Sequence, residues 1–107
     1  MDKRQDKINL LLQKEVAQII AQEVQFPEAL VSVAKLTTDN NASELRIKIS
    51  VLPEKFTGTV LKELRKKSSF LAKEIHRKAR LKRVPKIFWS VEEKDDVYAL
   101  EEILNSF

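Results

Sequence analysis

The amino-terminal part of the chain shows the three- and four-residue spacing of an amphipathic helix. Its apolar positions are Ile8, Leu11, Leu12, Val16, Ile19 and Ile20, and the polar side chains on the other side are Gln13, Lys14 and Gln18. We expect this helix to stop before Pro27, because a proline displaces the residue before it from helical backbone angles. The pattern therefore predicts one long helix with an apolar face.

Three later segments have the pattern of strands. Residues Leu30 to Leu36 have strand composition but alternate imperfectly, and the polar run Thr37 to Asn41 is typical of a turn. Residues Glu44 to Val51 alternate strictly between apolar and polar side chains, which predicts one buried face and one wet face. A third, shorter strand is expected around Ile87 to Val91. The first two strands and the turn between them predict a hairpin.

Two helices are expected between the second and third strands. Their apolar positions are Phe56, Val60, Leu61 and Leu64 in the first helix and Leu71, Ile75 and Ala79 in the second. The pair Ser68-Ser69 lies between them. Serine side chains cap helix starts by accepting hydrogen bonds from free backbone N–H groups, so we expect a serine-capped break here.

The predicted order is helix, strand, strand, helix, helix, strand and a short terminal helix over residues 97–107. No repeat, low-complexity stretch or long linker divides the chain. We therefore expect one α+β domain over residues 1–107, with an acidic C-terminal extension from about residue 92. No apolar run approaches the roughly eighteen residues of a membrane helix, and the first residues are charged, so we expect a cytoplasmic protein without membrane contact.

Composition narrows the possible chemistry. Cysteine is absent and histidine occurs once, which excludes disulfides, thiolate nucleophiles and cysteine- or histidine-rich zinc sites. The net charge is +4, but residues 55–86 hold 12 Lys or Arg against 2 Glu, whereas residues 87–107 hold 1 Lys against 6 Asp or Glu. Like charges three or four positions apart on a helix repel each other. The basic run therefore favours an external anion, and RNA phosphate is the obvious candidate.

Motifs spread over most of the chain resemble those of one known family. They are Leu12 to Ala17, Phe26-Pro27, Asp39 in the predicted turn, Phe70 to Ile75, and Arg80 to Trp89. Over roughly Arg4 to Leu104 the chain resembles the ribosome-binding factor A family. The chain departs from the family at Lys67-Ser68-Ser69, where an Ala-x-Gly kink is usual, at Phe26, where an aspartate is usual, and at Glu92.

The resemblance implies a type II KH-like fold, in the order helix-strand-strand-helix-helix-strand, plus a short C-terminal helix. An ordinary KH domain holds RNA with a Gly-x-x-Gly loop. This chain cannot have that loop, because Gly58 is its only glycine. Members of the family also lack it, so the missing loop favours this family over other KH proteins.

The resemblance also implies a function, that of a non-enzymatic bacterial assembly factor without a cofactor or metal. Such a factor binds the free or precursor small (30S) ribosomal subunit and 16S rRNA, serves rRNA processing and 30S maturation, and matters in the cold. Release by a ribosome-associated GTPase is implied too. We expect a monomer.

The basic run supplies the candidate RNA-binding residues. They are Lys62, Arg65, Lys66, Lys67, Lys73, Arg77, Lys78, Arg80, Lys82 and Arg83. Helical spacing places Lys73, Arg77 and Arg80 on a face opposite the apolar one. The arginines are the preferred contacts, because a guanidinium binds phosphate with two parallel hydrogen bonds. The alternative is a cationic face that is merely solvated.

The sequence also allows predictions for two aromatic residues, the histidine and the acidic tail. Trp89 is expected in the core and Phe88 on the opposite strand face, where it either stacks on a base or packs against a helix. His76 has no carboxylate or nucleophile patterned around it, so we do not expect catalysis. The acidic tail lacks the ligand order of a metal loop, and one hypothesis is that it shields the basic residues.

Two other classes of protein remain open from the sequence. Two short helices with a basic second member also describe a helix-turn-helix protein that binds DNA. Alternatively, the basic and acidic regions pair between chains in a protein-interaction module. An enzyme is the weakest class, because the chain lacks a phosphate-binding glycine loop and an acid-base pair.

Overall fold

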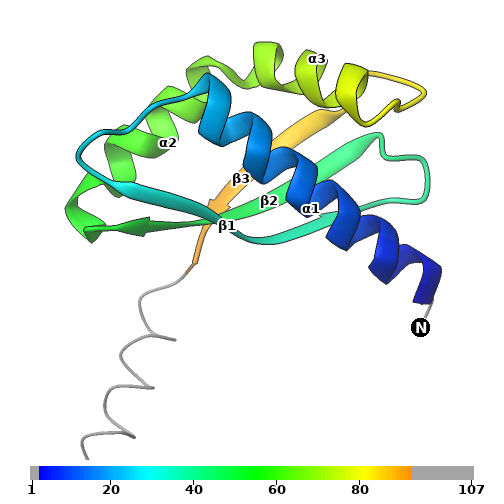
Figure 1. Cartoon of the computed structure of the whole chain (residues 1–107), viewed down its shortest axis with the longest axis horizontal. Helices are drawn as coiled ribbons and strands as arrows, with labels where there is room; N and C mark the ends of the chain where they lie inside the picture. Colours follow the sequence, from blue (N-terminus) through cyan, green and yellow to red (C-terminus); the bar gives the residue numbers. More distant parts are fainter. Residues whose placement is uncertain (1–2, 93–107) are drawn as a thin grey trace, which may run out of the picture.

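Three helices and a three-stranded sheet make up residues 3–92, the part of the chain that the computed structural model describes (Figure 1). The elements are α1 (Lys3–Glu23), β1 (Leu30–Thr38), β2 (Glu44–Leu52), the 3-10 turn η1 (Glu54–Phe56), α2 (Thr57–Lys66), α3 (Ser68–Lys78) and β3 (Lys86–Val91). The predicted order through the third strand is confirmed, as is the α+β, KH-like class. The predicted terminal helix lies outside the described residues.

The middle strand of the sheet is β2. It pairs antiparallel with β1 and parallel with β3, and the parallel pair requires the crossover that α2 and α3 provide. Leu45, Ile47 and Ile49 of β2 are fully buried in one cluster with side chains from all three helices. The helices therefore share one face of the sheet. The strict alternation predicted for β2 is confirmed.

The hairpin between β1 and β2 differs from the prediction in two ways. The register shifts between Val33 and Lys35, and this β-bulge explains the imperfect alternation of β1. The strand also continues through Thr38, so the turn starts at Asp39 rather than at position 37. The backbone N–H of Ser43 donates to Asp39 Oδ1 at 2.8 Å and its hydroxyl donates to Oδ2, and this side-chain hydrogen bond lowers the pKa of Asp39 below its ordinary value of 3.8.

Helix α1 ends before Pro27, as predicted, but its apolar positions are only partly buried. Leu12, Val16, Ile19 and Ile20 pack in the core, but Ile8 and Leu11 remain 39% and 68% exposed. The first turn of α1 still contacts the end of β1, because Gln5 Nε2 donates to the carbonyl oxygen of Thr38 at 3.3 Å. Ile8 and Leu11 instead border an open hollow beside the end of α3. The placement of Gln13 on the side away from the packed face is wrong, because its Nε2 donates to the carbonyl oxygen of Val33 at 3.1 Å, beside the bulge.

The break between α2 and α3 is a single residue, Lys67, with φ −95° and ψ 8°. The expected serine cap is wrong, because α3 has no side-chain hydrogen bond at its start. The Ser68 hydroxyl instead accepts a hydrogen bond of 3.2 Å from Trp89 Nε1. Trp89 packs against the core from β3, as predicted. The hydrogen bond thus ties the first turn of α3 to the sheet.

Candidate RNA-binding surface

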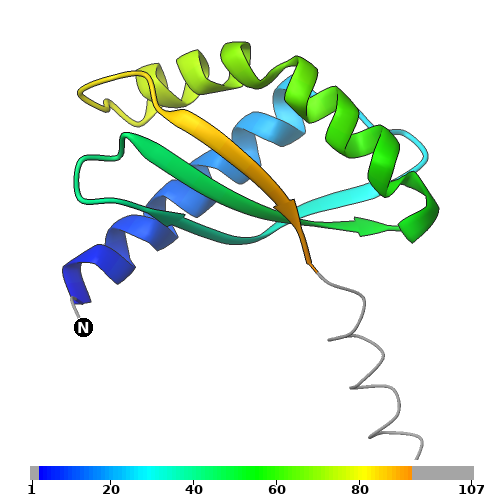
Figure 2. The ribbon, with the colours of Figure 1, turned by 180° about the vertical axis from the view of Figure 1, so that it is seen from behind.

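The ten candidate RNA-binding residues lie on α2, on α3 and in the turn that follows α3. Both views show the two helices nearly end to end along one side of the molecule (Figures 1 and 2). Eight of the ten residues are exposed, whereas Lys67 and Lys78 are half-buried. The buried positions Val60 and Leu64 of α2 and Leu71 and Ile75 of α3 lie on the sides that pack against the core. The fold therefore turns most of the predicted cations toward solvent.

The expectation of an unopposed basic cluster is wrong for three of these residues. Lys67 pairs with Glu63 at 3.7 Å, and Arg77 with Glu74 at 2.8 Å. Lys78 lies 4.0 Å from Glu74 and also donates to the Gln22 side chain at 3.2 Å, which links α3 to α1. The two glutamates of the basic run thus neutralise part of its charge within the helices.

The other seven cations make no side-chain hydrogen bond or ion pair with any residue in 3–92. They are Lys62, Arg65, Lys66, Lys73, Arg80, Lys82 and Arg83, and we call them the basic helical surface. Arg65 and Lys66 occupy the last turn of α2, where a positive charge interacts favourably with the carbonyl end of the helix, by about 0.3–1 kcal/mol. The end of α2 thus gives Arg65 and Lys66 a favourable local interaction. The other five cations lie outside the last turn of α2 and do not have this interaction.

Arg80 lies in an unusual backbone conformation. Helix α3 ends at Lys78, and Arg80 follows with φ 55°, in the left-handed region. The backbone N–H of Leu81 donates to the carbonyl oxygen of His76 at 3.1 Å, which is the hydrogen bond of a Schellman helix end. Glycine is usual at this position, and another residue costs about 1–2 kcal/mol. The prediction that Arg80 shares a helical face with Lys73 and Arg77 is wrong, because Arg80 lies beyond the helix.

An aromatic residue on α3 was missed as a candidate. The side chain of Phe70 is 47% exposed, although its neighbours Leu71 and Ala72 are buried. Lys73, three residues further on, is a member of the basic helical surface. An exposed ring one helical turn from a lysine offers a surface on which a base can stack. The sequence already indicated that Phe70 is exposed, because this residue does not share the four-residue spacing of Leu71 and Ile75 on the buried side of the helix.

Phe88 lies on the face of the sheet that the helices leave open. In the register of the sheet it stands beside Arg46, whereas Ile87 and Trp89 stand beside the buried Leu45 and Ile47. Packing of Phe88 against a helix, one of its two expected roles, is therefore wrong. The base-stacking role stays a prediction.

The structure assembles no catalytic group around His76. Its imidazole makes no hydrogen bond or ion pair with any residue in the described part of the chain. Within residues 3–92 no three His, Asp or Glu side chains lie close enough together to hold a metal ion. The same residues include no helix that is both long and apolar enough to cross a membrane.

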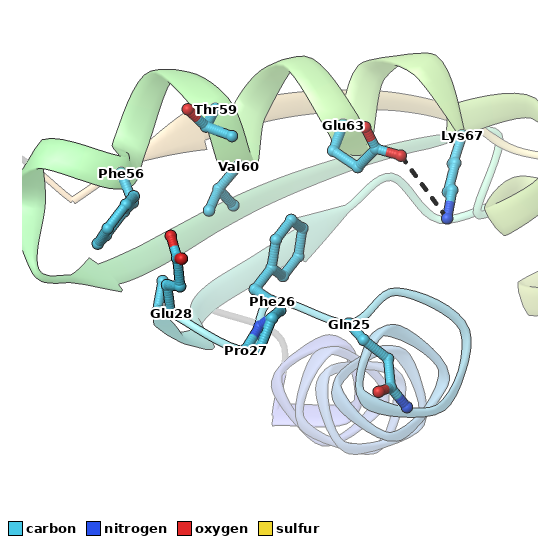
Figure 3. A pocket seen from close by; sticks show the side chains of 10 residues that line it. Gln25, Phe26, Pro27, Glu28, Phe56, Thr59, Val60, Glu63 and Lys67 are labelled. Atoms are coloured by element: carbon cyan, nitrogen blue, oxygen red, sulfur yellow. Dashed lines mark ion pairs between the residues drawn. The ribbon is translucent and has the colours of Figure 1, made fainter.

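A shallow hollow of about 270 Å³ lies beside the start of α2 (Figure 3). Phe26 and Pro27 face Phe56 and Val60 across it. Its volume is below the roughly 300 Å³ at which small-molecule pockets begin. Lys67, at one end, is the single candidate RNA-binding residue that lines it, and this lysine is already paired with Glu63 (Figure 3). The hollow is therefore separate from the basic helical surface.

Comparisons with known proteins agree with this architecture. A family model described as ribosome-binding factor A matches residues 4–104. A protein of Akkermansia muciniphila named ribosome-binding factor A is 24% identical over 108 aligned positions, which cover 96% of this chain and 86% of that protein.

A solved structure gives the same result for the fold. The crystal structure of ribosome-binding factor A from Thermus thermophilus superposes with a TM-score of 0.68 at 20% identity, covering 79% of this chain and 92% of that one. The family match spans almost the whole chain, and the structural match extends over most of it. The chain therefore belongs to the ribosome-binding factor A family.

Proposed function

We propose that this protein is a non-enzymatic assembly factor that binds the immature 30S ribosomal subunit at its 16S rRNA and serves rRNA processing and subunit maturation. Family membership supports the ribosomal partner. The observation that carries the RNA contact is the basic helical surface, whose seven exposed cations have no partner in residues 3–92. Phosphate groups of RNA would supply the missing counter-charges.

The proposed contact has a definite chemistry. Arg65, Arg80 and Arg83 each present a planar guanidinium that binds a phosphate with two hydrogen bonds, and the lysines add less directional charge. The exposed ring of Phe70, one helical turn from Lys73, provides a stacking surface. If roughly five to eight phosphates are neutralised, affinity falls as about the fourth to sixth power of the salt concentration, which follows from the slope for single strands.

The geometry speaks against a helix-turn-helix protein. That motif joins its two helices by a turn of about three or four residues at a steep angle. Here one residue, Lys67, separates α2 from α3, and both helices contribute to a core shared with a sheet. DNA recognition by α3 is therefore the weaker reading, and a self-associating interaction module has no support from the described surface.

The proposal includes a cytoplasmic location, a bacterial host, a monomeric protein and a role in the cold. It also includes a ribosome-associated GTPase that releases the factor from the subunit. Family membership supports each of these.

Sedimentation of tagged protein through a gradient of bacterial lysate tests the proposal. The wild-type protein is expected with free or precursor small subunits, and the R65E/R80E/R83E variant is expected at the top of the gradient. Arg77 is left intact, because its loss would also break the ion pair with Glu74. A matched control, K7E/K14E/K55E, reverses three cations outside the surface and should sediment like the wild type.

Two results would overturn the proposal. One is wild-type protein that stays at the top of the gradient even in low salt. The other is an R65E/R80E/R83E variant that still travels with small subunits, which would place the RNA contact elsewhere on the molecule. Thermal unfolding of each variant shows whether the fold survives the charge reversal.

A further inference from the structure

The face of the sheet away from the helices carries a second group of cations. Neighbouring strands bring together Lys35 of β1, Arg46 and Lys48 of β2, and Lys86 of β3. Arg46 and Lys48 alternate with the buried residues of β2, Lys35 stands opposite Lys48, and Lys86 lies two positions before Phe88 on the same side of β3, so all four point away from the helices. Figure 2 views the molecule from behind, with α1 on the far side of the sheet.

Two of these cations lie over the ring of Phe88 in cation–π contacts. Arg46 Cζ and Lys86 Nζ each lie 5.2 Å from the centre of the ring. Phe88 stays half-exposed and does not belong to the apolar side chains packed against the core. An aromatic ring with cations nearby on the open face of a sheet is the kind of feature on which RNA-recognition sheets stack unpaired bases.

The charges of this face are poorly balanced within residues 3–92. Lys35 stands directly opposite Lys48 across the β1-β2 pair, where like charges destabilise a sheet. Glu44, at the start of β2, forms one exposed ion pair with Arg46 at 3.6 Å. Glu92 follows the end of β3. Lys35, Lys48 and Lys86 have no ion pair with a residue in the described part of the chain.

We propose that this open sheet face binds a single-stranded segment of RNA, with a base stacked on Phe88 and the backbone phosphates held by Lys35, Lys48 and Lys86. The inference rests on the proposed function, because it assigns a second contact with the same kind of ligand. The two surfaces lie on different sides of the molecule. One protein thereby holds an unpaired strand on its sheet and rRNA phosphates on its helices.

Charge and shape favour this ligand over other occupants. A second copy of the same basic face would be repelled. In an RNA duplex the bases are stacked on each other, so none is free to cover Phe88. An acidic peptide would satisfy the lysines, but carboxylates offer no aromatic face to the half-exposed ring of Phe88.

The first test uses a fluorescein-labelled, single-stranded oligouridine of about ten nucleotides and fluorescence anisotropy, with the full chain. The variant Phe88→Leu keeps apolar bulk but removes the ring, and it should weaken binding about fivefold or more. The double variant K35Q/K48Q should lower the slope of log affinity against log salt by about 1.4, from the loss of two phosphate contacts. The matched control K7Q/K14Q removes two lysines from α1 and should bind like the wild type.

The second test maps the contact by amide shifts in two-dimensional NMR spectra during titration with the same oligouridine. Shifts at Lys35, Arg46, Lys48 and Phe88 are expected. Shifts confined to α2 and α3, together with wild-type binding by Phe88→Leu, would overturn the inference and leave the proposed function standing.

Failure of the wild-type protein to associate with small subunits would overturn the proposed function instead. That function rests on the basic helical surface and does not depend on the sheet face. Binding of a synthetic peptide of residues 93–107 to the sheet face in preference to oligouridine would assign the face to an acidic segment and also overturn the inference.

Discussion

The two faces of the sheet use the same strands for opposite purposes. On the covered face, Leu45, Ile47 and Ile49 have no exposed area and pack against three helices. On the open face, their immediate neighbours Arg46 and Lys48 bear charge. Burial of apolar area supplies stability, whereas the cations of the open face bring little or even cost some. Substitutions on the covered face should therefore change the stability of the fold, whereas substitutions on the open face should change RNA binding.

The largest expected effect is on the covered face. Ile47→Ala removes a fully buried side chain from the middle strand and should lower the free energy of unfolding by about 2–5 kcal/mol, measured by urea denaturation. Its neighbour supplies the control, because Lys48→Gln should change stability by less than about 0.5 kcal/mol. Equal losses in the two variants would contradict the assignment of the faces.

A smaller loss of stability is expected when the hydrogen bond between α3 and the sheet is removed. Ser68→Ala removes the hydroxyl that accepts from Trp89 Nε1 and leaves a partly buried N–H without its partner, which should cost about 1 kcal/mol. Ser69→Ala, at the exposed neighbouring position, is the matched control and should cost less. Thermal unfolding followed by circular dichroism compares them. A loss for Ser69→Ala as large as that for Ser68→Ala would show that the hydrogen bond to Trp89 does not stabilise the fold.

Replacing Arg80 with glycine should stabilise the protein and weaken its binding to small subunits. Arg80→Gly relieves the left-handed backbone and should raise the free energy of unfolding by about 0.5–1 kcal/mol in chemical denaturation. The same change removes one cation of the basic helical surface and should weaken association with small subunits. Arg80→Lys keeps the charge and the strain, so it should leave both quantities closer to the wild type. A stabilised glycine variant with full association would remove Arg80 from the proposed contact.

The smallest effect is expected on the open face. Lys35→Gln ends the repulsion with Lys48 across the strands and should raise stability by a few tenths of a kcal/mol. Because surface charge pairs are screened by ions, the gain should shrink in high salt. Chemical denaturation in low and high salt measures the gain in stability and its dependence on salt. A destabilised Lys35→Gln protein would show that the lysine makes a contact of structural importance.

Periodicity predicted the order of the elements but not all of their contacts. The strict alternation of β2 and the spacing of α2 and α3 identified most of the buried residues correctly. Leu11 was misjudged, because the period of a helix shows which side is apolar but not which of those positions another element covers. The Ser68 cap was misjudged for a similar reason, since the competing partner, Trp89, is distant in sequence.

The candidate site was predicted in part. The run of Lys and Arg in residues 55–86 indicated the exposed surface of α2 and α3. The ion pairs of Lys67 and Arg77 follow helical spacing and were overlooked. The cations of the open face could not be grouped from the sequence, because Lys35, Arg46 and Lys86 come from three strands whose pairing and register are set by long-range contacts.

The sequence by itself determined the class of fold, the family resemblance and the location of the basic run, because hydrophobic period and charge are local properties of the chain. Only the tertiary structure decided which cations lack partners, where Arg80 lies relative to α3, and that Phe88 stands among cations on the open sheet. Those features depend on residues far apart in sequence that meet only when the sheet and helices bury one shared core.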